Sequence, residues 1–351
     1  MQDLLFSDLP EPPAPAPSPA ATPEPRAAKP RLAKVRPLAP TPEGLALREA
    51  LSPRVRLGTS SWSYPGWAQL VWDGEYSESM LSKHGLAAYA QHPLMRTVSI
   101  DRTFYRPLSA SHFAAYAAAV PEDFRFIVKA PASVSDAVIR SEDGRGVQPN
   151  PLFLNPELAL QDFVQPALDG LGDRLGALVF QLSPLPLPML RQMPEVLNRL
   201  RTLLTTLPQL QPATTDGVIA IEVRDAEFLT PDFAAVLRDT GATYCLGLHA
   251  KMPPIDQQLP LLRALWPGPL VCRWNLHPRH GSISGYAKAE KAYQPYDRVH
   301  DDDPLTREAL ARVIAATARH GQNVFVGVSN HAEGSAPHSV LALAQAVHDA
   351  A

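Results

Sequence analysis

The sequence has little cysteine and no long apolar run, and both shortages narrow the class of protein. Cys245 and Cys272 are the only two cysteines in 351 residues. Both lie in apolar, strand-like stretches, which favours two reduced thiols in a core over a disulfide. No apolar run is long enough to cross a membrane, and no basic segment followed by an apolar one opens the chain. These features predict a cytoplasmic protein without membrane span or secretory signal.

Cofactor motifs and an excess of one charge are also missing. Neither a CxxC or HExxH spacing for a metal nor a Gly-rich loop for a nucleotide occurs, so we predict no cofactor and no bound metal. Lys and Arg number 32 against 35 Asp and Glu, giving a net charge of −3. That balance argues against a large phosphate-binding surface for nucleic acid.

The first 50 residues differ in composition from the rest. Prolines mixed with alanine, threonine and charged residues dominate residues 10–42, and such a segment offers too little apolar surface to fold. We therefore expect a disordered Pro/Ala-rich tail over residues 1–50, followed by one domain over residues 51–351. The tip, Gln2-Asp3-Leu4-Leu5-Phe6, resembles the peptide by which bacterial replication and repair proteins dock on the sliding clamp, which makes the clamp a candidate partner.

From Arg54 onward, strand-like and helix-like segments alternate to the end of the chain. Such alternation implies parallel strands joined by right-handed crossovers. Eight such units predict an α/β fold, a closed (β/α)8 TIM-like barrel, with an open doubly wound sheet as the alternative. The predicted strands are Val55–Ser61, Thr97–Ile100, Phe124–Ala130, Ala177–Leu182, Val218–Arg224, Thr243–Leu248, Leu270–Leu276 and Asn323–Ser329.

Polar side chains gather where these strands end. The run from Val218 to Arg224 is apolar and β-branched, yet it ends in Glu222 and Arg224, whose spacing of two puts both on one face. A charged pair at the end of a buried strand is costly unless it is paired or used. Because the strands of such a barrel end at one mouth, where its reaction sites lie, we predict a polar, cation-rich pocket edged by aromatic residues.

The residue types in this pocket favour a small ligand carrying carboxylate or phosphate. Arginine and lysine suit such anions, Glu222 is the predicted general base, and Tyr105 is the predicted proton donor. The predicted catalytic residues are Glu222, Lys129, Tyr105 and Asp101. The predicted substrate-binding residues are Trp62, Tyr64, Gln181, Arg224, Arg273, His277 and Asn330. Whether the protein is an enzyme or only binds the ligand stays open.

Several segments, in order along the chain, resemble one known family. They are Gly58-Thr59-Ser60 with Trp62-Ser63-Tyr64-Pro65-Gly66-Trp67, Thr103-Phe104-Tyr105-Arg106, Phe124-Arg125-Phe126 with Val128-Lys129-Ala130-Pro131, Phe180-Gln181-Leu182, Ile221-Glu222-Val223-Arg224 and Ser329-Asn330. Together they are similar to the YecE-like family of bacterial and archaeal proteins of unknown function, over residues 54–345. The resemblance implies a TIM-like barrel and no particular activity.

This chain departs from the family pattern at three places, as a divergent branch does. One is Ala132-Ser133-Val134-Ser135, after Pro131, which lacks the family's usual histidine. The family usually reads Glu-Ile-Asn where this chain has Ser99-Ile100-Asp101, so the resemblance does not support the role predicted for Asp101. The family's Arg-x-His-Gly is stretched here to Arg273-Trp274-Asn275-Leu276-His277, so it does not support the role predicted for His277 either.

Two other functions remain open from the residues alone. A metal-dependent barrel hydrolase, isomerase or endonuclease would use Glu222, His249, His277 and His331 as converging ligands. A non-enzymatic accessory protein of DNA replication or repair would use the Gln2–Phe6 peptide, the basic stretch Arg26–Arg36 and the loop His277–His280.

Overall fold

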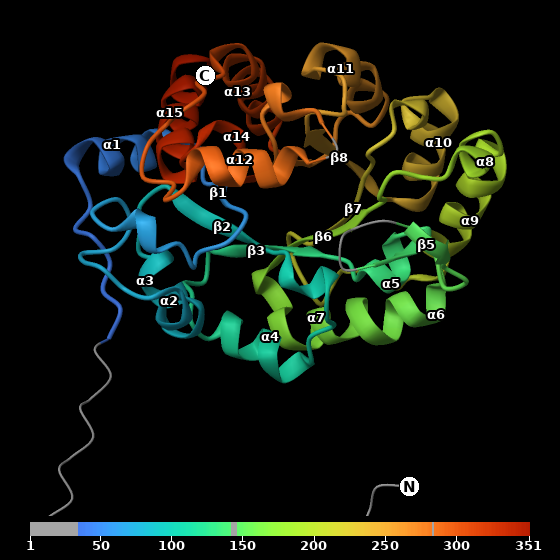
Figure 1. The fold of residues 1–351 in the computed structure, drawn as a ribbon, viewed down its shortest axis with the longest axis horizontal. Helices are drawn as coiled ribbons and strands as arrows, with labels where there is room; N and C mark the ends of the chain where they lie inside the picture. Colours follow the sequence, from blue (N-terminus) through green and yellow to red (C-terminus); the bar gives the residue numbers. More distant parts are fainter. Residues whose placement is uncertain (1–33, 142–145, 283) are drawn as a thin grey trace, which may run out of the picture. The chain divides into compact units, whose positions relative to one another are not determined.

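Eight parallel strands close into a barrel at the centre of the computed structural model (Figure 1). The structure describes residues 34–141, 146–282 and 284–351, so the Gln2–Phe6 peptide and most of the basic stretch Arg26–Arg36 lie outside the described residues. At the end of that stretch, Arg36 forms an ion pair with Asp73 at 2.7 Å. Around the barrel, in order, stand β1 (Val55–Thr59), β2 (Met95–Ile100), β3 (Arg125–Lys129), β6 (Leu175–Gln181), β7 (Val218–Glu222), β8 (Thr243–Leu248), β9 (Leu270–Trp274) and β10 (Val324–Val328). The predicted barrel is confirmed, and the open sheet is wrong because β1 pairs with β10.

The strands are apolar on both faces because both faces are covered. Outward-facing residues pack against the helices, whereas a separate cluster fills the barrel interior. Cys245 belongs to that interior cluster and Cys272 to the outer core, and both are buried free thiols. The interior cluster consists of Ile127, Ala177, Val179, Ala220, Cys245, Val271 and Phe325.

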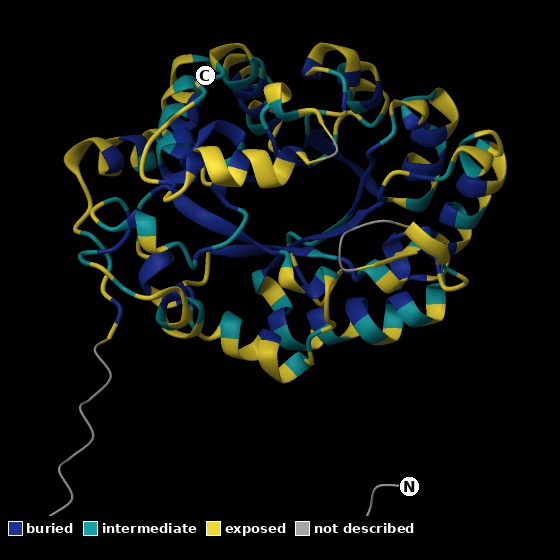
Figure 2. Ribbon diagram, viewed as in Figure 1, coloured by how far each residue is buried: buried dark blue, intermediate teal, exposed yellow. Residues whose placement is uncertain are grey.

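Helices surround the strands, turning a buried face toward the barrel and an exposed face outward (Figure 2). The longer ones are α1 (Pro42–Ala50), α2 (Glu78–His84), α4 (Ala110–Ala117), α7 (Gln165–Leu171), α9 (Met193–Thr206), α10 (Pro231–Thr240), α11 (Ile255–Ala264), α12 (Gly285–Tyr293), α13 (Pro304–Arg319) and α15 (Ala336–Asp349). The short ones are α3 (Leu86–Tyr89), α5 (Ala132–Ser135), α6 (Pro156–Ala159), α8 (Leu187–Leu190) and α14 (Asn330–Glu333). None of the helices that the structure describes has the length and apolarity of a membrane span.

The helix ends follow local rules. In α9, Val196, Leu200 and Leu203 recur at helical spacing and are buried. Asp303 caps α13 by accepting a hydrogen bond from the Thr306 N–H, with proline at the first turn. Gly241 ends α10 at a φ of 73°, a left-handed conformation that glycine adopts without a steric penalty.

Residues 35–50 belong to the barrel domain, although their composition placed them in the predicted tail. Val35 is buried, and the Leu38 N–H donates to the Val71 carbonyl at 2.9 Å. The helix α1 follows, capped by Thr41, with Leu47 turned into the core. A few apolar residues among the prolines are enough to dock this segment, because the core next to it supplies the partner surface.

The amino-terminal end of the barrel is closed by ion pairs. Arg56 and Arg125 both contact Asp216, at 2.9 and 2.8 Å, and Arg96 contacts Asp123 at 2.7 Å. Arg56 and Arg125 therefore share one carboxylate at this end, and Arg96 contacts a second one. Partly buried pairs of this kind hold strand ends together and leave little free charge for a ligand.

Candidate functional site

A cavity of about 690 Å³ opens at the carboxyl ends of the strands. Every barrel strand contributes a lining residue at its end or within two residues after it, which is the arrangement predicted from the strand exits. These residues, in chain order, are Ser60, Asp101, Lys129, Gln181, Arg224, His249, Arg273 and Ser329.

Glu222 lies under the floor of this cavity and is fully buried. Its Oε1 forms an ion pair with Arg224 at 2.7 Å and accepts a hydrogen bond from the Asn275 amide at 3.0 Å, and its Oε2 accepts one from Arg273 at 2.7 Å. Burial alone would raise the pKa of Glu222, but the two guanidinium groups outweigh it and lower the pKa to about 2. A carboxylate held in this way is a weak base. The contacts hold Glu222 and both arginines in fixed positions, and the role of Glu222 as general base stays a prediction.

Glycines flank Arg273 on both neighbouring strands. Gly247 of β8 and Gly327 of β10 are its partners in the strand register. A Cβ at Gly327 would lie 3.0 Å from the Ser99 hydroxyl oxygen, and one at Gly247 would lie 3.4 Å from Cγ of Glu222. The missing side chains therefore let Ser99 and Glu222 lie close to these two strands.

Arg273 also connects Glu222, beneath the cavity, with Asp101 on the cavity wall. One of its terminal nitrogens contacts Glu222, and the other donates to the Asp101 Oδ2. Gln181 links the two arginines, since its Oε1 accepts from Arg224 at 2.9 Å and from Arg273 at 3.3 Å. Asp101, Gln181, Glu222, Arg224 and Arg273 thus form one connected polar network.

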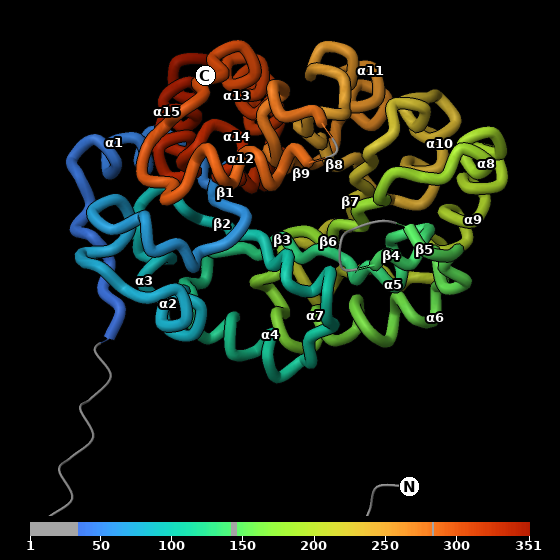
Figure 3. The backbone as a smooth tube through the Cα atoms, in the orientation of Figure 1, coloured from blue at the N-terminus to red at the C-terminus, as the bar shows by residue number. Residues whose placement is uncertain are grey.

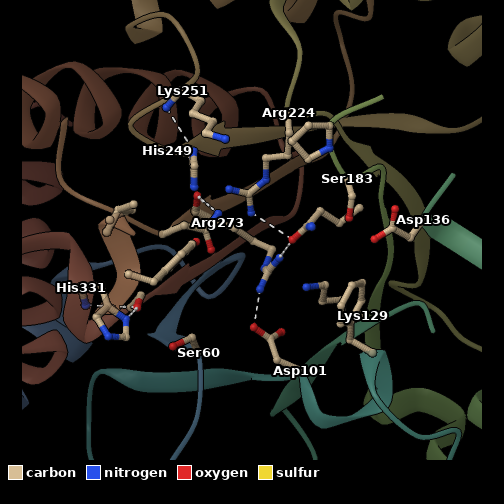
Figure 4. Close-up of a pocket in the computed structure, with 18 of the residues that line it drawn as sticks. Ser60, Asp101, Lys129, Asp136, Ser183, Arg224, His249, Lys251, Arg273 and His331 are labelled. Carbon is tan, nitrogen blue, oxygen red and sulfur yellow. Dashed lines mark hydrogen bonds and ion pairs between the residues drawn. The ribbon is translucent and has the colours of Figure 1, made fainter. Parts of the chain in front are cut away.

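Lys129 stands on the cavity wall at the end of β3, half-buried. Its Nζ lies 3.8 Å from the centroid of the Phe104 ring, which is a favourable place for a cation. Figure 4 shows this amine facing the same space as Asp101 and Arg273. Burial first, and the charge of Arg273 second, lower the pKa of Lys129 to about 7.

The loop after β2 holds Lys129 in place. The Thr103 hydroxyl donates to the carbonyls of Ile100 and Lys129, at 2.7 and 2.6 Å, and so ties the ends of β2 and β3 together. Phe104 then supports the lysine, while Tyr105 is 87% exposed on the rim of the cavity. The predicted proton donor Tyr105 therefore lies in solvent and not beside Glu222.

Two histidines line the opposite part of the cavity. His249 Nδ1 accepts a hydrogen bond from the Lys251 N–H at 3.1 Å, and burial together with Arg224 lowers the pKa of His249 to about 3. His331 Nε2 is 3.1 Å from the Tyr296 hydroxyl, and burial lowers its pKa as well. Both rings are therefore neutral at pH 7 and bring no charge to the site.

Two elements that we did not predict complete the cavity. The hairpin of β4 (Val138–Arg140) and β5 (Gly146–Pro149) contributes Arg140, and α12 contributes Tyr286. Figure 3 shows α12 and this hairpin on different sides of the barrel centre. Their signals in the sequence are weak, since the hairpin strands are only three and four residues long and α12 carries mostly alanine and charged residues.

Three of the predicted substrate-binding residues do not line this cavity. Trp62 is buried edge-on against Tyr116, with ring centroids 5.5 Å apart. His277 caps the next turn by accepting from the Arg279 N–H at 3.2 Å. Asn330 is fully buried and accepts from the Ala336 N–H at 2.8 Å, which caps α15. Tyr64, in contrast, does line the cavity, as predicted.

The four side chains that a metal site would have used do not come together. Within the described ranges, no three His, Cys, Asp or Glu residues are grouped so as to hold an ion. Glu222 is taken up by its arginine partners, and His277 and Asn330 point their acceptors at backbone N–H groups. The predicted convergence of Glu222, His249, His277 and His331 is therefore wrong.

The loop His277–His280, proposed for DNA contact, is also engaged within the chain. Arg279 and the Tyr293 hydroxyl both bind the Asp301 carboxylate. His280 Nε2 lies 2.8 Å from the same Tyr293 hydroxyl. These contacts anchor the segment before α12 and leave the loop few free donors for phosphates.

The sequence as a whole matches one family model, described as Protein of unknown function DUF72, over residues 56–351. This chain belongs to DUF72. The family of unknown function expected from the motifs is thereby confirmed. A search among curated proteins found no match to this chain.

Solved structures of other DUF72 proteins share the fold. One from Thermotoga maritima has a TM-score of 0.53 and 18% identity, covering 83% of this chain and 98% of that chain. Another from Enterococcus faecalis has a TM-score of 0.52 and 15% identity, covering 84% of this chain and 95% of that chain. At this level of identity the likeness shows the barrel fold alone.

Proposed function

We propose that this DUF72 protein binds a small carboxylate or phosphate compound in the cavity at the barrel mouth and acts on it there. The observation that carries the proposal is Lys129, a half-buried amine on the cavity wall that makes no ion pair with any described carboxylate. Placing a lysine in such a position lowers the stability of the fold. A group that costs stability and lies in a cleft is a good candidate for a functional residue.

The charges around the cavity favour an anion. Its wall carries the cations Lys129, Arg140, Arg224, Lys251 and Arg273, against the carboxylates Asp101 and Asp136, with Glu222 beneath. Among the described residues, five cations therefore face three acids. Arg140, Arg224 and Arg273 contact these acids, whereas Lys129 and Lys251 form no ion pair with a described residue. An anion in the cavity would neutralise this excess positive charge. The cations of the wall would lose little hydration when it binds, because the wall is already partly dry.

Hydrogen-bond donors for an anion are already oriented. The Arg224 side chain is fixed by Glu222 and Gln181 through its terminal nitrogen, while its Nε is buried and donates to no described residue. Lys251 adds an exposed amine at the rim, and it has no ion pair in the described part of the chain. Fixed donors of this kind bind an anion without reorganising first.

Replacing Lys129 with methionine is expected to weaken the binding of pyruvate and of inorganic phosphate by about 10- to 100-fold, the usual contribution of a charge-assisted hydrogen bond. Isothermal titration calorimetry at low salt measures this. Lys83→Met on α2 is the matched control, since Lys83 is exposed and does not line the cavity. Equal affinities in all three proteins, or no binding of either anion by the unaltered protein, would overturn the proposed function.

The affinity for pyruvate is expected to rise as the pH falls through about 7. Burial and the charges of Arg273 and Arg224 lower the pKa of Lys129 to about 7, although the carboxylates of Asp101 and Glu222 act in the opposite direction. The amine therefore gains its charge as the pH falls through this range. Pyruvate keeps its own charge between pH 6 and 9. The slope of affinity against pH should disappear in Lys129→Met; a slope that survives this substitution would assign the titration to another group.

A further inference from the structure

We propose that Lys129 forms an imine with its ligand, so that the ligand is a small aldehyde or ketone that also carries the carboxylate or phosphate. This inference rests on the proposed function for the anionic half of the ligand. The carbonyl half is assigned from the placement of the Lys129 amine beside the Asp101 carboxylate at the end of the barrel.

The surroundings of Lys129 suit a nucleophilic amine. The end of β3 and the Phe104 ring hold the chain, and the Thr103 hydroxyl fixes the Lys129 carbonyl, so the amine has few positions open to it. The absence of an ion pair leaves the nitrogen free to react once it has lost its proton. Burial and Arg273 make that loss easier near neutral pH. A lysine in a partly dry pocket next to other cations is the usual activated amine for imine chemistry.

Asp101 supplies the second group that the reaction needs. Its Oδ2 is bound by Arg273, which fixes the carboxylate, while its Oδ1 is buried and accepts no hydrogen bond from any described residue. A buried carboxylate oxygen without a donor is costly, and it is an available proton acceptor on the cavity wall. Because Lys129 and Asp101 form no ion pair with each other, a proton from Lys129 would reach Oδ1 of Asp101 through the bound ligand or a water molecule.

The reaction balances without a further reagent. The Lys129 nitrogen lone pair attacks the carbonyl carbon, forming a C–N bond and breaking the C=O π bond. One proton then moves from nitrogen to this oxygen through Asp101, which gives a carbinolamine. The second nitrogen proton reaches the hydroxyl by the same route, and the hydroxyl leaves as water while the C=N bond forms. The sum is amine plus carbonyl giving imine plus water, with nothing oxidised or reduced.

The geometry also divides the ligand between two parts of the cavity. The carbonyl carbon would lie against Lys129 and Asp101, and the anionic group would extend from Lys129 toward Arg224. Figure 4 shows Arg224 on the other side of Arg273 from Lys129. The test therefore uses one ligand with the anionic group next to the carbonyl and one with the two groups further apart.

Reductive trapping tests the inference on the intact chain. The protein is mixed with pyruvate or with acetone, which has the same ketone but no charge, and in parallel with dihydroxyacetone phosphate or with dihydroxyacetone. Sodium borohydride then converts any imine to a stable secondary amine, and peptide mass spectrometry gives the labelling rate at each lysine. We expect pyruvate or dihydroxyacetone phosphate to label Lys129 at least tenfold faster than exposed Lys83, and at least tenfold faster than its neutral counterpart labels Lys129.

Two variants sharpen the test. Lys129→Arg keeps the charge but cannot form the imine, so it should retain calorimetric binding of pyruvate while losing the label. Asp101→Asn should slow labelling about tenfold or more at saturating ligand, where a change in affinity does not enter the rate. A Lys129 rate no higher than that of Lys83 for any of the four probes would overturn the imine, and binding in calorimetry would then leave the proposed function standing. Equal Lys129 labelling by charged and neutral ketones would support the imine and overturn the anion site.

Discussion

Replacing Glu222 with glutamine is expected to lower the free energy of unfolding by about 3–5 kcal/mol, the usual cost of removing one partner from a buried ion pair. The substitution keeps the shape of the side chain, so the loss reports charge rather than packing. Arg224 and Arg273 would remain buried without the carboxylate that now contacts both, at 2.7 Å each. Denaturation by urea, followed by circular dichroism, measures the change.

The dependence of the unfolding free energy on pH is a second measurement that tests Glu222→Gln. The pKa of Glu222 is lowered from 4.5 to about 2, because the guanidinium groups outweigh the opposing effect of burial. The stabilisation from this carboxylate is therefore complete above pH 4.5 and is lost as the pH falls toward 2. Glu222→Gln should lack this part of the acid dependence. Exposed Glu227→Gln, the control, should keep it and change stability by less than about 0.5 kcal/mol.

A double substitution separates charge from shape. Adding Arg273→Met to Glu222→Gln removes one of the stranded cations and should recover part of the lost stability, which a double-mutant cycle measures. If Glu222→Gln were as stable as the unaltered protein at pH 7, the polar network would not hold the arginines in the way described. Additive losses in the cycle would likewise contradict a shared network.

Gly58→Ala is the second change with a large expected effect, a loss of about 3 kcal/mol or more, because a methyl group there has no space. A Cβ at Gly58 would lie 1.8 Å from the Thr97 carbonyl oxygen, and that obstacle is backbone, which cannot rotate away. The register between β1 and β2 already shifts at this point. Since the barrel is closed, spreading these two strands would disturb their neighbours as well. Thermal unfolding and soluble yield measure the effect.

Gly74→Ala is the matched control for this substitution. A Cβ at Gly74 would meet no atom within 4 Å, so the change should stay within about 0.5 kcal/mol of the unaltered protein. If Gly58→Ala unfolded at the same temperature as Gly74→Ala, close approach of β1 and β2 would not be what requires glycine at position 58.

The sequence was informative about the barrel because its strands are buried on both faces, so each appears as a continuous apolar run. The same pattern placed Asp101, Lys129, Gln181 and Arg273 correctly around one mouth, since all four sit at strand ends. What lies beyond the strand ends obeys no such rule. The hairpin β4–β5 and helix α12 are insertions whose short or polar patterns look like loops.

The roles of individual side chains were harder to predict than their positions. His277 and Asn330 follow strands just as Lys129 does, yet each is used locally, by accepting a backbone N–H. Trp62 follows β1 and turns into the core instead of the cavity. The packing of neighbouring loops decides whether such a side chain lines the cavity, caps a backbone N–H or enters the core. A residue's distance from a strand end does not show which of these occurs.

The glycines beside Arg273 also limit how this protein family can change. A Cβ at Gly327 would crowd the Ser99 hydroxyl, and one at Gly247 would crowd Glu222. A larger residue at 327 therefore demands a smaller one at 99, and a larger residue at 247 displaces the carboxylate that contacts Arg224 and Arg273. Substitutions at 99 and 327, and at 222 and 247, should therefore occur as correlated pairs among relatives.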